Sequence, residues 1–319
     1  MIGVGELKQI KSNMMSDIKP LVSVVMPVFN ASLYLDEAIE SVLWQTLPEF
    51  ELIIINDGST DNSFQLLKQW EKKDSRIKVY DQENKGRSIT RNRGLELATT
   101  EYIAMMDADD ISMPNRLKLC YEFLMAHKDV VAVSGQYKTM CMYGVSMYKS
   151  SLPLGHEEIE RDLLQDKGDS FTQGAAMIIK SVAKKVGGYN SSYELGEDAD
   201  LFLKMALEGK LQNLSVVLLK YRQHASSITN TMNKNLISNC IVRVRQAWID
   251  RELQFDDNFE HYLESVTEKK EYNSYLKWGW NALAKGELVI ARRYAIKLLL
   301  TSPFHLDIYR FVYCSIRGR

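Results

Sequence analysis

The sequence predicts an α/β protein: a mainly parallel sheet flanked by helices, followed by a C-terminal extension made of helices alone. Two patterns predict this fold. Between residues 21 and 133, short apolar runs alternate with amphipathic runs, as strands and helices alternate along a parallel sheet. After about residue 230, apolar residues recur only at helical spacing. We therefore expect an N-terminal extension over residues 1–19, a sheet domain over 20–230 and a helical region over 231–319.

The first part of the chain supplies alternating strand and helix candidates. The expected strands are the short apolar runs Val22–Met26, Glu51–Asn56, Ile77–Tyr80, Tyr102–Met106 and Val130–Val133. The expected helices between them are Leu33–Trp44, Ser63–Glu71, Ile89–Ala98 and Asn115–His127. In the first helix, apolar residues occur at offsets of 0, 3, 4, 7 and 8 from Leu35, which places them on one face.

The rest of the chain is less regular at first and then becomes helical. Residues 136–170 are mostly polar, and only Glu157–Gln165 is expected to be a helix there. A strand, a turn, a helix and a segment that closes the sheet domain are expected at Ala175–Lys180, Gly187–Tyr189, Glu197–Glu208 and Lys220–His224. Near the C-terminus two sets of residues share helical faces: Leu276, Trp280 and Leu283, and then Ala291, Tyr294, Ala295, Leu298 and Leu299. Gly286 and Pro303 end these helices; the pair has the character of a helical repeat, but one copy does not establish a repeat.

The composition is that of an ordinary soluble globular protein. Hydrophobic residues make up 45% of the 319 residues and charged residues 25%. A formal net charge of −1 gives no reason to expect a nucleic-acid partner. The four cysteines lie far apart and form no Cys-X-X-Cys pair, so we expect a reducing compartment and neither a zinc site nor a disulfide framework.

The N-terminal part of the sequence predicts a cytoplasmic protein. Residues 1–20 carry charges throughout and lack the continuous apolar core of a signal peptide. The longest apolar stretch, residues 21–35, is interrupted by Pro27 and Asn30 and falls short of the ~20 residues that a membrane-spanning helix needs. We expect the protein in the cytoplasm, either free or peripheral at the inner face of the cytoplasmic membrane.

Clustered carboxylates follow the fourth expected strand, in the segment Asp107-Ala-Asp109-Asp110. Such carboxylates repel one another and lose solvation, so they usually hold a cation. Oxygen ligands favour magnesium or manganese, and these ions often bridge to substrate phosphates. The alternative interpretation is a polar turn that caps the next helix, after Pro114. Because ligands of parallel sheets bind beyond the carboxyl ends of the strands, we expect these acids on the same edge as Asn30 and Asp57.

Two loops could contribute to the same edge. In the segment Asn56–Asp61, the carboxylate of Asp57 could accept a hydrogen bond from an N–H group of a nucleotide base. The alternative interpretation is an ordinary strand-to-helix turn. The segment Lys85–Gly94 places four cations on a loop and the first turns of a helix, which suits a phosphate. A solvated helix face is the plainer explanation of those cations.

Two further features could carry chemistry. Glu197 and Asp198 begin an expected helix, where acids complement the helix dipole and where a carboxylate would stay ionised as a general base must. His224 is either a core histidine or a third metal ligand. Glycine-rich dinucleotide-binding and phosphate-binding loops and the Gly-X-Ser-X-Gly elbow are absent from the sequence.

Taken in order, these segments resemble family 2 of the inverting nucleotide-sugar glycosyltransferases, of the bacterial polysaccharide-biosynthesis type. The similarity extends over residues 20–229. It rests on the segments Val22–Asn30, Leu33–Ser41, Gln45–Thr46, Glu51–Asp61, Asn84–Gly86, Arg91–Gly94, Tyr102–Asp110, Pro114–Leu117, Gly187–Tyr189, Glu197–Asp198 and Tyr221–His224. The resemblance implies the GT-A fold, a Rossmann-like sheet flanked by helices.

The resemblance also implies a role for each candidate residue. On the donor side, the nucleotide-sugar-binding residues would be Pro27, Val28, Asn30, Asp57 (on the base, usually uracil), Arg87, Arg91 (a weaker candidate than Arg87) and Asp107 (on the ribose or sugar). Asp109 would bind the metal, with His224 completing the metal shell. On the acceptor side, Gly187, Gly188, Tyr189 and Glu197 would border the acceptor, and Asp198 would be the catalytic base. Two departures stand out: Asn56 occupies a position where the family often has an acid, and residues 135–172 match no motif.

The implied reaction is a single displacement with inversion. A divalent cation, manganese or magnesium, would stabilise the departing nucleoside diphosphate, and a hexose or N-acetylhexosamine would move from a donor, expected to be UDP-linked, to a glycan or lipid-linked glycan hydroxyl. The alternatives are a non-catalytic sugar-nucleotide-binding protein and a metal-dependent nucleotidyltransferase. From Arg292 to the C-terminus the sequence contains six Lys/Arg and only one acid, Asp307, interspersed with aromatic residues. This composition indicates either helices that contact an anionic membrane surface or a helical lid that packs on the catalytic domain.

Overall fold

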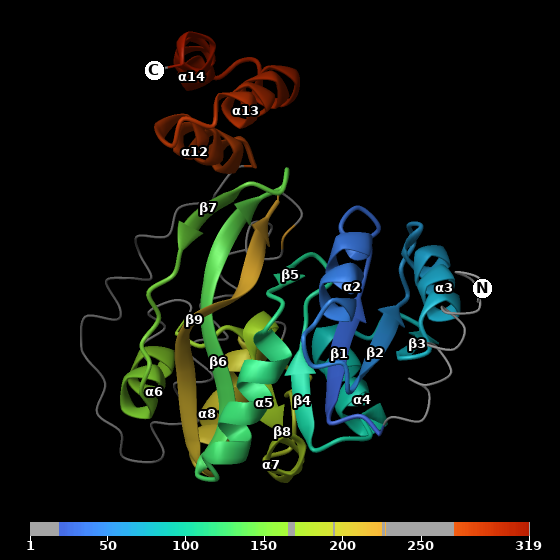
Figure 1. The fold of residues 1–319 in the computed structure, drawn as a ribbon. Coiled ribbons are helices and arrows are strands. Elements are labelled where there is room, and N and C mark those ends of the chain that lie inside the picture. The colour runs from blue at the N-terminus through green and yellow to red at the C-terminus, as the bar shows by residue number, and fades with distance from the viewer. Residues whose placement is uncertain (1–18, 165–169, 194, 225–226, 228–270, 319) are drawn as a thin grey trace, which may run out of the picture. The chain divides into compact units, whose positions relative to one another are not determined.

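The computed structural model describes residues 19–164, 170–193, 195–224, 227 and 271–318 (Figure 1). They divide into two compact units. The first holds the described residues of 1–137 and 151–221, and the second holds those of 138–150 and 222–319. Residues 1–18 of the expected N-terminal extension and the boundary expected at residue 230 lie outside the described residues.

The sheet begins with parallel strands, as expected. These are β1 (Val22–Val28), β2 (Phe50–Asp57), β3 (Ile77–Gln82) and β4 (Tyr102–Met105). The central strand β1 pairs with both β2 and β4, so that Val25 lies opposite Ile53 on one side and Met105 on the other. The full order is β3-β2-β1-β4-β8-β6-β9-β5.

The second half of the sheet is largely antiparallel. Strand β8 (Met177–Ile179) pairs antiparallel with β4 and with β6 (Val130–Cys141), and β5 (Ile111–Ser112) pairs antiparallel with β9 (Lys210–Gln223). Strand β7 (Ser146–Lys149) pairs with β6. The sheet is therefore mixed rather than mainly parallel as expected, because the strands after β4 pair antiparallel. The α/β class and the helices beyond the sheet are confirmed.

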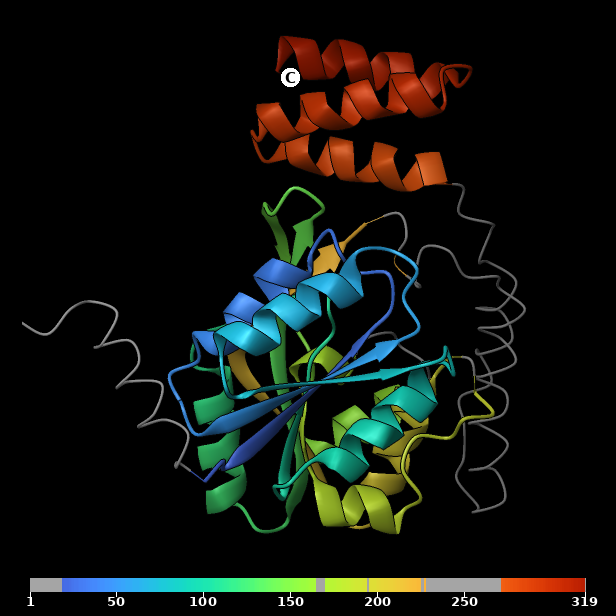
Figure 2. The same cartoon turned by 90° about the vertical axis from the view of Figure 1, so that its right-hand side faces the viewer.

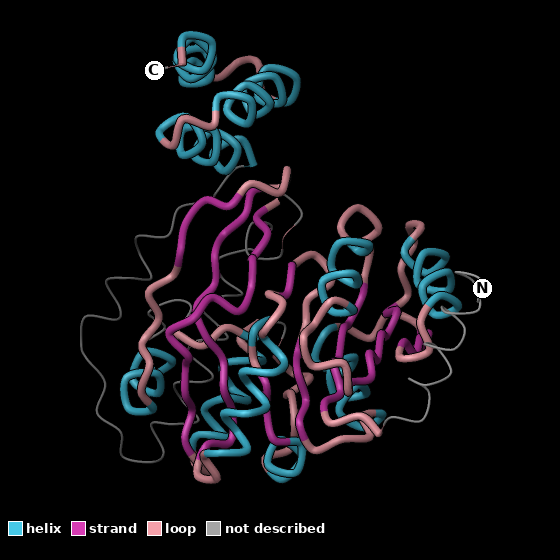
Figure 3. The backbone as a smooth tube through the Cα atoms, viewed as in Figure 1, coloured by secondary structure: helices cyan, strands magenta, loops and turns pink. Residues whose placement is uncertain are grey.

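Helices cover both faces of the sheet in the first unit (Figures 2 and 3). Helices α2 (Leu35–Leu43), α3 (Ser63–Lys73) and α5 (Arg116–Ala126) supply buried residues to one core cluster. The other cluster receives residues from α4 (Arg87–Leu97), α6 (His156–Leu164), α7 (Lys180–Lys185) and α8 (Glu197–Ala206). A short 3₁₀ helix, η1 (Gln173–Ala175), precedes β8.

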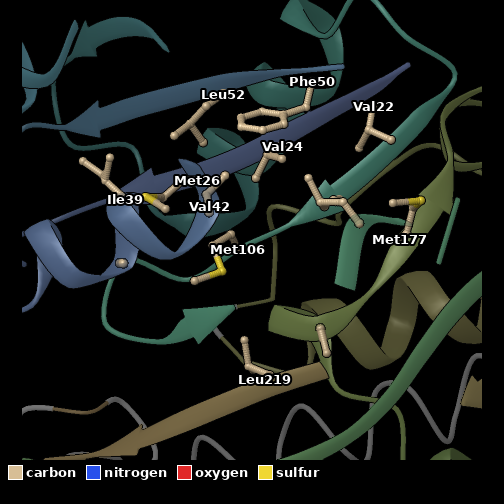
Figure 4. Close-up of a cluster of buried hydrophobic side chains, with 14 of the residues drawn as sticks. Val22, Val24, Met26, Ile39, Val42, Phe50, Leu52, Met106, Met177 and Leu219 are labelled. Carbon is tan, nitrogen blue, oxygen red and sulfur yellow. The ribbon is translucent and has the colours of Figure 1, made fainter. Parts of the chain in front are cut away.

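Alternation along the strands decides which core each side chain joins. Val24 of β1 and Leu52 of β2 join Ile39 and Val42 of α2 in one cluster (Figure 4), whereas Val25 points to the other face. Helix α4 packs closely on that second face: a Cβ added at Gly94 would lie 2.3 Å from Val25 Cγ1.

Strand β6 is longer than predicted, β8 is shorter, and the segment expected to close the sheet domain is the end of a long strand. Strand β6 continues to Cys141 instead of ending at Val133, and β9 begins at Lys210, well before Lys220. Both contain polar residues that neighbouring strands satisfy; for example, Thr139 Oγ1 accepts a hydrogen bond from the Tyr148 N–H. Conversely, the strand expected at Ala175–Lys180 is limited to Met177–Ile179 between η1 and α7.

The second unit has its own core. It contains helices α12 (Glu271–Ala284), α13 (Leu288–Thr301) and α14 (Leu306–Arg317), with the turn between β6 and β7. Buried members of this core include Cys141, Tyr275, Trp278, Tyr294 and Phe311. As predicted, helices end before Gly286 and Pro303. No described helix is long and apolar enough to span a membrane.

Candidate active site

Several predicted site residues follow strands that end at one edge of the sheet. Because β1, β2 and β4 are parallel neighbours, their carboxyl ends share that edge. Pro27 and Val28 close β1, Asn30 follows it, Asp57 closes β2, and Asp107 lies two residues beyond β4. The edge therefore collects the donor-side candidates, as the sequence predicted.

Hydrogen bonds of Asn30 connect the loop after β1 to the loop after β2. Its Oδ1 accepts hydrogen bonds from the backbone N–H groups of Thr60 (2.8 Å) and Asp61 (3.3 Å), and its own N–H donates to Ser59 Oγ (3.0 Å). Asn30 adopts a left-handed backbone conformation with a φ of 50°, which asparagine tolerates better than most residues. This loop pair forms the wall beside Pro27 and Val28.

Asp57 holds the loop that leads into helix α4. Its buried carboxylate accepts hydrogen bonds from Gln82 Nε2 (2.7 Å), the Lys85 N–H (2.9 Å) and the Gly86 N–H (3.0 Å). The turn also needs Gly58, since a Cβ there would lie 2.6 Å from the backbone nitrogen of Asn84. The side chain of the neighbouring Asn56 instead donates to Asp81 Oδ1 (2.6 Å).

A buried guanidinium joins residues from opposite sides of the predicted site. Arg91 Nη1 donates to Glu197 Oε1 at 2.6 Å, and Arg91 Nη2 lies 3.3 Å from Asp107 Oδ1. The same Glu197 oxygen is 3.4 Å from Arg87 Nη1. The side chains of Arg91 and Glu197 are only 5% and 3% exposed. The structure thus brings together four residues from three segments that are separate in the sequence.

The charges of this cluster shift one another's pKa values. Burial lowers the pKa of Arg91, but Asp107 and Glu197 outweigh burial and raise it, so the guanidinium stays charged. Burial raises the pKa of Glu197, and Asp198 adds to this effect against the opposing charges of Arg91 and Arg87. Burial likewise raises the pKa of Asp107; the Arg91 charge opposes the rise and Asp109 increases it.

The Gly187-Gly188-Tyr189 turn is fixed to helix α4 by Asn92. Asn92 Nδ2 donates to the Tyr189 carbonyl (2.7 Å), and the Tyr189 N–H donates to Asn92 Oδ1 (2.8 Å). A Cβ at Gly188 would lie 2.5 Å from Asn92 Oδ1. Gly187 is exposed, whereas the Tyr189 ring is buried with its centroid 5.5 Å from the Arg91 guanidinium carbon.

Asp198 lies in the first turn of α8, directly after Glu197, which pairs with Arg87 and Arg91. It is half-buried, and its Oδ1 accepts a hydrogen bond from the Ala199 N–H at 2.9 Å. The preceding Gly196 has a φ of 75°, a left-handed conformation that turns the chain into the helix. A carboxylate at this end of a helix is stabilised by the helix dipole.

The three acids after β4 have different surroundings. Asp107 and Asp109 are half-buried, and Asp110 is buried. Gly174 of η1 lies directly against them: a Cβ there would be 3.1 Å from Asp107 Oδ2 and 3.2 Å from Asp110 Oδ2. His224 is buried and belongs to the second unit. In the described part of the chain, no three His, Cys, Asp or Glu side chains are grouped closely enough to hold a metal ion.

The comparisons with known proteins identify the family. Residues 23–187, about half of the chain, match the family model described as Glycosyl transferase family 2. The chain belongs to glycosyltransferase family 2. It is 40% identical over 225 residues to the glycosyltransferase GlyG of Streptococcus pneumoniae, a match that covers 66% of this chain and 73% of GlyG. It is also 40% identical over 136 residues to the putative teichuronic acid biosynthesis glycosyltransferase TuaG of Bacillus subtilis, over 42% of this chain and only 54% of TuaG.

Solved structures show the same fold. The chain matches S. aureus TarS 1-349 in complex with UDP-GlcNAc with a TM-score of 0.57 at 16% identity, over 94% of this chain and 92% of that one. It matches the mannosyltransferase PcManGT from Pyrobaculum calidifontis, in complex with GDP-Man and Mn²⁺, with a TM-score of 0.54 at 17% identity, over 98% and 91% of the two chains. Membership of the family makes this chain a glycosyltransferase.

The acids after β4 of this family 2 glycosyltransferase fit a divalent cation. Burial raises the pKa of Asp107 and the charge of Asp109 adds to the rise, against the opposing charges of Arg91 and Arg87, so a cation there would stabilise the ionised carboxylate. Magnesium and manganese need few protein ligands when substrate phosphates and water supply the others. Asp109, with Asp107 beside it, would hold the ion.

Sequence reasoning missed two residues that contact the candidate site. Gln173 is buried and its Nε2 lies 2.5 Å from the Tyr189 hydroxyl, and Gly174 lies against the acids after β4. Both stand next to residues 135–172, where no motif could be matched. A glutamine and a glycine carry no distinctive pattern, so only their position beside the acids and Tyr189 marks them.

Proposed function

We propose that this protein transfers a hexose or N-acetylhexosamine from a UDP-linked donor to a glycan or lipid-linked glycan hydroxyl, with inversion and with the help of manganese or magnesium. One observation carries the proposal: the Arg91 guanidinium bridges Asp107, at the expected donor edge, and Glu197, which precedes the candidate base Asp198. The Arg91 side chain would therefore connect the donor-binding residues to the acceptor-binding residues.

The donor half would be held at the edge of the parallel strands. Pro27, Val28 and Asn30 would line the nucleotide pocket, and Asp57 would contact the base through the lone pairs its three N–H donors leave. Arg87 is partly exposed and stands at the start of α4, so it can move from Glu197 to a diphosphate. A bound cation would supply positive charge to the leaving diphosphate as that charge grows.

The acceptor half would be organised at the start of α8. Asp198 would accept the proton of the attacking hydroxyl, and Glu197 would stay ion-paired with Arg91 and Arg87. Gly187, Gly188 and Tyr189 would border the acceptor from the turn that Asn92 holds. Attack from the side opposite the leaving diphosphate inverts the anomeric centre in one step, without a covalent sugar–enzyme intermediate.

The donor and the cation are supported by the structures with the same fold. TarS is described in complex with UDP-GlcNAc, and PcManGT in complex with GDP-Man and Mn²⁺. The acceptor class is supported by the similarity to TuaG, a putative teichuronic acid biosynthesis glycosyltransferase. We further propose that the protein acts in the cytoplasm, peripheral to the inner face of the membrane where lipid-linked glycans are accessible.

The decisive experiment measures nucleoside diphosphate release from a panel of sugar nucleotides, with manganese or with a chelator. We expect release of UDP from a UDP-sugar in manganese and its loss in chelator or in Asp109→Ala. The matched control is Asp129→Asn, an exposed acid paired with Lys210 away from the site. Release of nucleoside monophosphate or inorganic phosphate, or no turnover by the wild-type protein, would refute the proposal.

The role of Asp198 is tested in the same assay with glycan acceptors added. General-base catalysis typically contributes about 10²–10⁴-fold, so Asp198→Asn should slow transfer by about that factor. Calorimetric binding of UDP with manganese should stay within a few-fold of wild type. A variant that transfers at the wild-type rate would remove Asp198 from the mechanism.

A further inference from the structure

Helices α13 and α14 and the turn between them carry several exposed apolar side chains. Leu300 is 80% exposed, Phe304 96% and Leu306 85%. We call the full set the apolar edge: Val289, Ile296, Leu300, Phe304, Leu306, Tyr309, Tyr313 and Ile316. Exposed apolar groups are common singly, but a set of this size usually marks an interaction surface.

The apolar edge is not an unfilled part of the unit's own core. On α14 the exposed residues Leu306, Tyr309, Tyr313 and Ile316 alternate at helical spacing with the buried residues Ile308, Phe311 and Ser315. On α13 the exposed Ile296 and Leu300 lie on the face opposite the buried Tyr294 and Leu298. Each helix therefore already buries one apolar face and presents a second one outward.

The structure also corrects which aromatic residues could reach a partner. The sequence grouped Tyr294 and Phe311 with the other aromatic residues of the basic C-terminal segment. Both are fully buried in the core of the second unit. Phe304, Tyr309 and Tyr313 remain exposed.

Cations outnumber acids along the apolar edge. Between Leu288 and Arg317 the chain carries five Lys/Arg and one acid, Asp307; the five cations are Arg292, Arg293, Lys297, Arg310 and Arg317. Among the described residues, none of these five is paired with a carboxylate. Arg292 donates to the carbonyls of Ser315 and Ile316 (both 3.2 Å), and the Arg317 guanidinium carbon is 4.8 Å from the Tyr313 ring centroid. Within the described residues, no carboxylate therefore forms an ion pair with these five cations.

We propose that the apolar edge and its cations form a docking surface for an anionic lipid bilayer. Lipids offer both requirements at once, negatively charged headgroups for the arginines and hydrocarbon for Leu300, Phe304 and Leu306. A second copy of the chain is disfavoured as the partner because a symmetric interface would place one basic face against another. The inference deepens the proposed membrane location and rests on that part of the proposed function. It adds the residues that enter the lipid.

The test is sedimentation of the full-length protein with vesicles of phosphatidylcholine, with and without phosphatidylglycerol. We expect binding that requires phosphatidylglycerol and weakens as salt is added, because headgroup attraction is screened. The double variant Phe304→Asp, Leu306→Asp should lower the partition coefficient at least about tenfold, since each replaced side chain places a charge in hydrocarbon. The double variant Arg310→Gln, Arg317→Gln should weaken the dependence on phosphatidylglycerol.

The matched control is Trp44→Asp, which removes an exposed aromatic residue (76% exposed) from the first unit. It should bind vesicles as the wild type does. Thermal melts of all variants check folding, which substitutions at exposed positions should leave unchanged. Equal binding to neutral vesicles, or undiminished binding of the Phe304 and Leu306 variant, would overturn the proposal. If the wild type bound no vesicles and formed a dimer in light scattering that the Phe304 and Leu306 variant did not form, the partner would be a second copy of the chain and the proposal would be overturned. Vesicle binding needs no donor, so these outcomes do not depend on glycosyl transfer.

Discussion

At the scale of single residues, Arg91 is the most connected side chain of the candidate site. Its partners Asp107 and Glu197 lie 16 and 106 positions away in the sequence. Each of the three was predicted as a site residue, but their contact was not, because nothing in a local pattern reports a pairing across such separations. The guanidinium is buried and its charge is satisfied by protein carboxylates, which suggests that Arg91 positions the site rather than binds the donor.

A buried charge network makes a sharp prediction about stability. Arg91→Gln should lower the free energy of unfolding by about 3–5 kcal/mol, because it leaves the buried Glu197 carboxylate poorly compensated. The double variant Arg91→Gln, Glu197→Gln should recover part of this loss. Urea denaturation of the two single variants, the double variant and the wild type measures the coupling between the residues.

An exposed pair provides the control for that cycle. Lys118 and Glu122 are four residues apart on α5, with side chains 52% and 59% exposed. Their coupling should not exceed about 0.5 kcal/mol. If the Arg91–Glu197 effects were additive to within about 0.5 kcal/mol, the network would not act as a unit.

At the scale of elements, sequence patterns predicted those that bury an apolar face. The strands β1, β2 and β4 and the helices α2 to α5 were found within a few residues of their expected bounds. Strand β6 was predicted too short and most of β9 was not predicted, because both carry polar residues along much of their length. Their extent depends on the strands beside them, since pairing satisfies the backbone whatever the side chains are.

Glu51 shows how a polar residue can stabilise an element whose pattern is otherwise apolar. Glu51 follows the first residue of β2 and is buried there; its carboxylate accepts hydrogen bonds from Ser23 Oγ (2.6 Å), the Thr99 N–H (2.8 Å) and Lys78 Nζ (2.7 Å). Burial raises the pKa of Glu51, but these hydrogen bonds outweigh burial, and the pKa lies below the ordinary value of 4.5.

The lowered pKa fixes the sign of a pH-dependent effect. The ionised form of Glu51 is favoured in the folded state, so its stabilisation is present above pH 4.5 and is lost as the pH falls below that value. Glu51→Gln should therefore lower the free energy of unfolding by about 1–3 kcal/mol near neutral pH. The difference from wild type should shrink in acid. Urea unfolding across this pH range tests it, with Glu96→Gln, an exposed glutamate on α4, as the control. A difference independent of pH would contradict the assignment.

At the scale of the whole molecule, the chain comprises two units with separate cores. The donor-side candidates Asn30, Asp57, Arg87 and Asp107 all belong to the first unit. In the second unit, α12 approaches α14 at a glycine: a Cβ at Gly279 would lie 2.3 Å from Phe311 Cζ. Close packing of this kind depends on a position with no side chain.

Gly279→Ala should therefore destabilise the second unit and leave the stability of the first unit unchanged. The clash with Phe311 should destabilise the second unit by about 1–3 kcal/mol, more than the helix propensity of alanine restores. Binding of UDP with manganese should persist. The control is Gly155→Ala, where an added Cβ meets no heavy atom within 4 Å. Thermal unfolding and calorimetric binding of both variants provide the comparison. Equal loss of nucleotide binding and of helical stability would show that the units unfold together.

The sequence alone determined the α/β class, the strand edge that carries the acids, the helical C-terminal region and the identity of most candidate site residues. It could do so because apolar periodicity and clustered charges are local properties of the chain. The tertiary structure decided the bridge from Asp107 through Arg91 to Glu197, the positions of Gln173 and Gly174 beside the site, and which aromatic residues of α13 and α14 are buried. These depend on contacts between residues far apart in sequence, and such contacts exist only once the sheet and helices have packed.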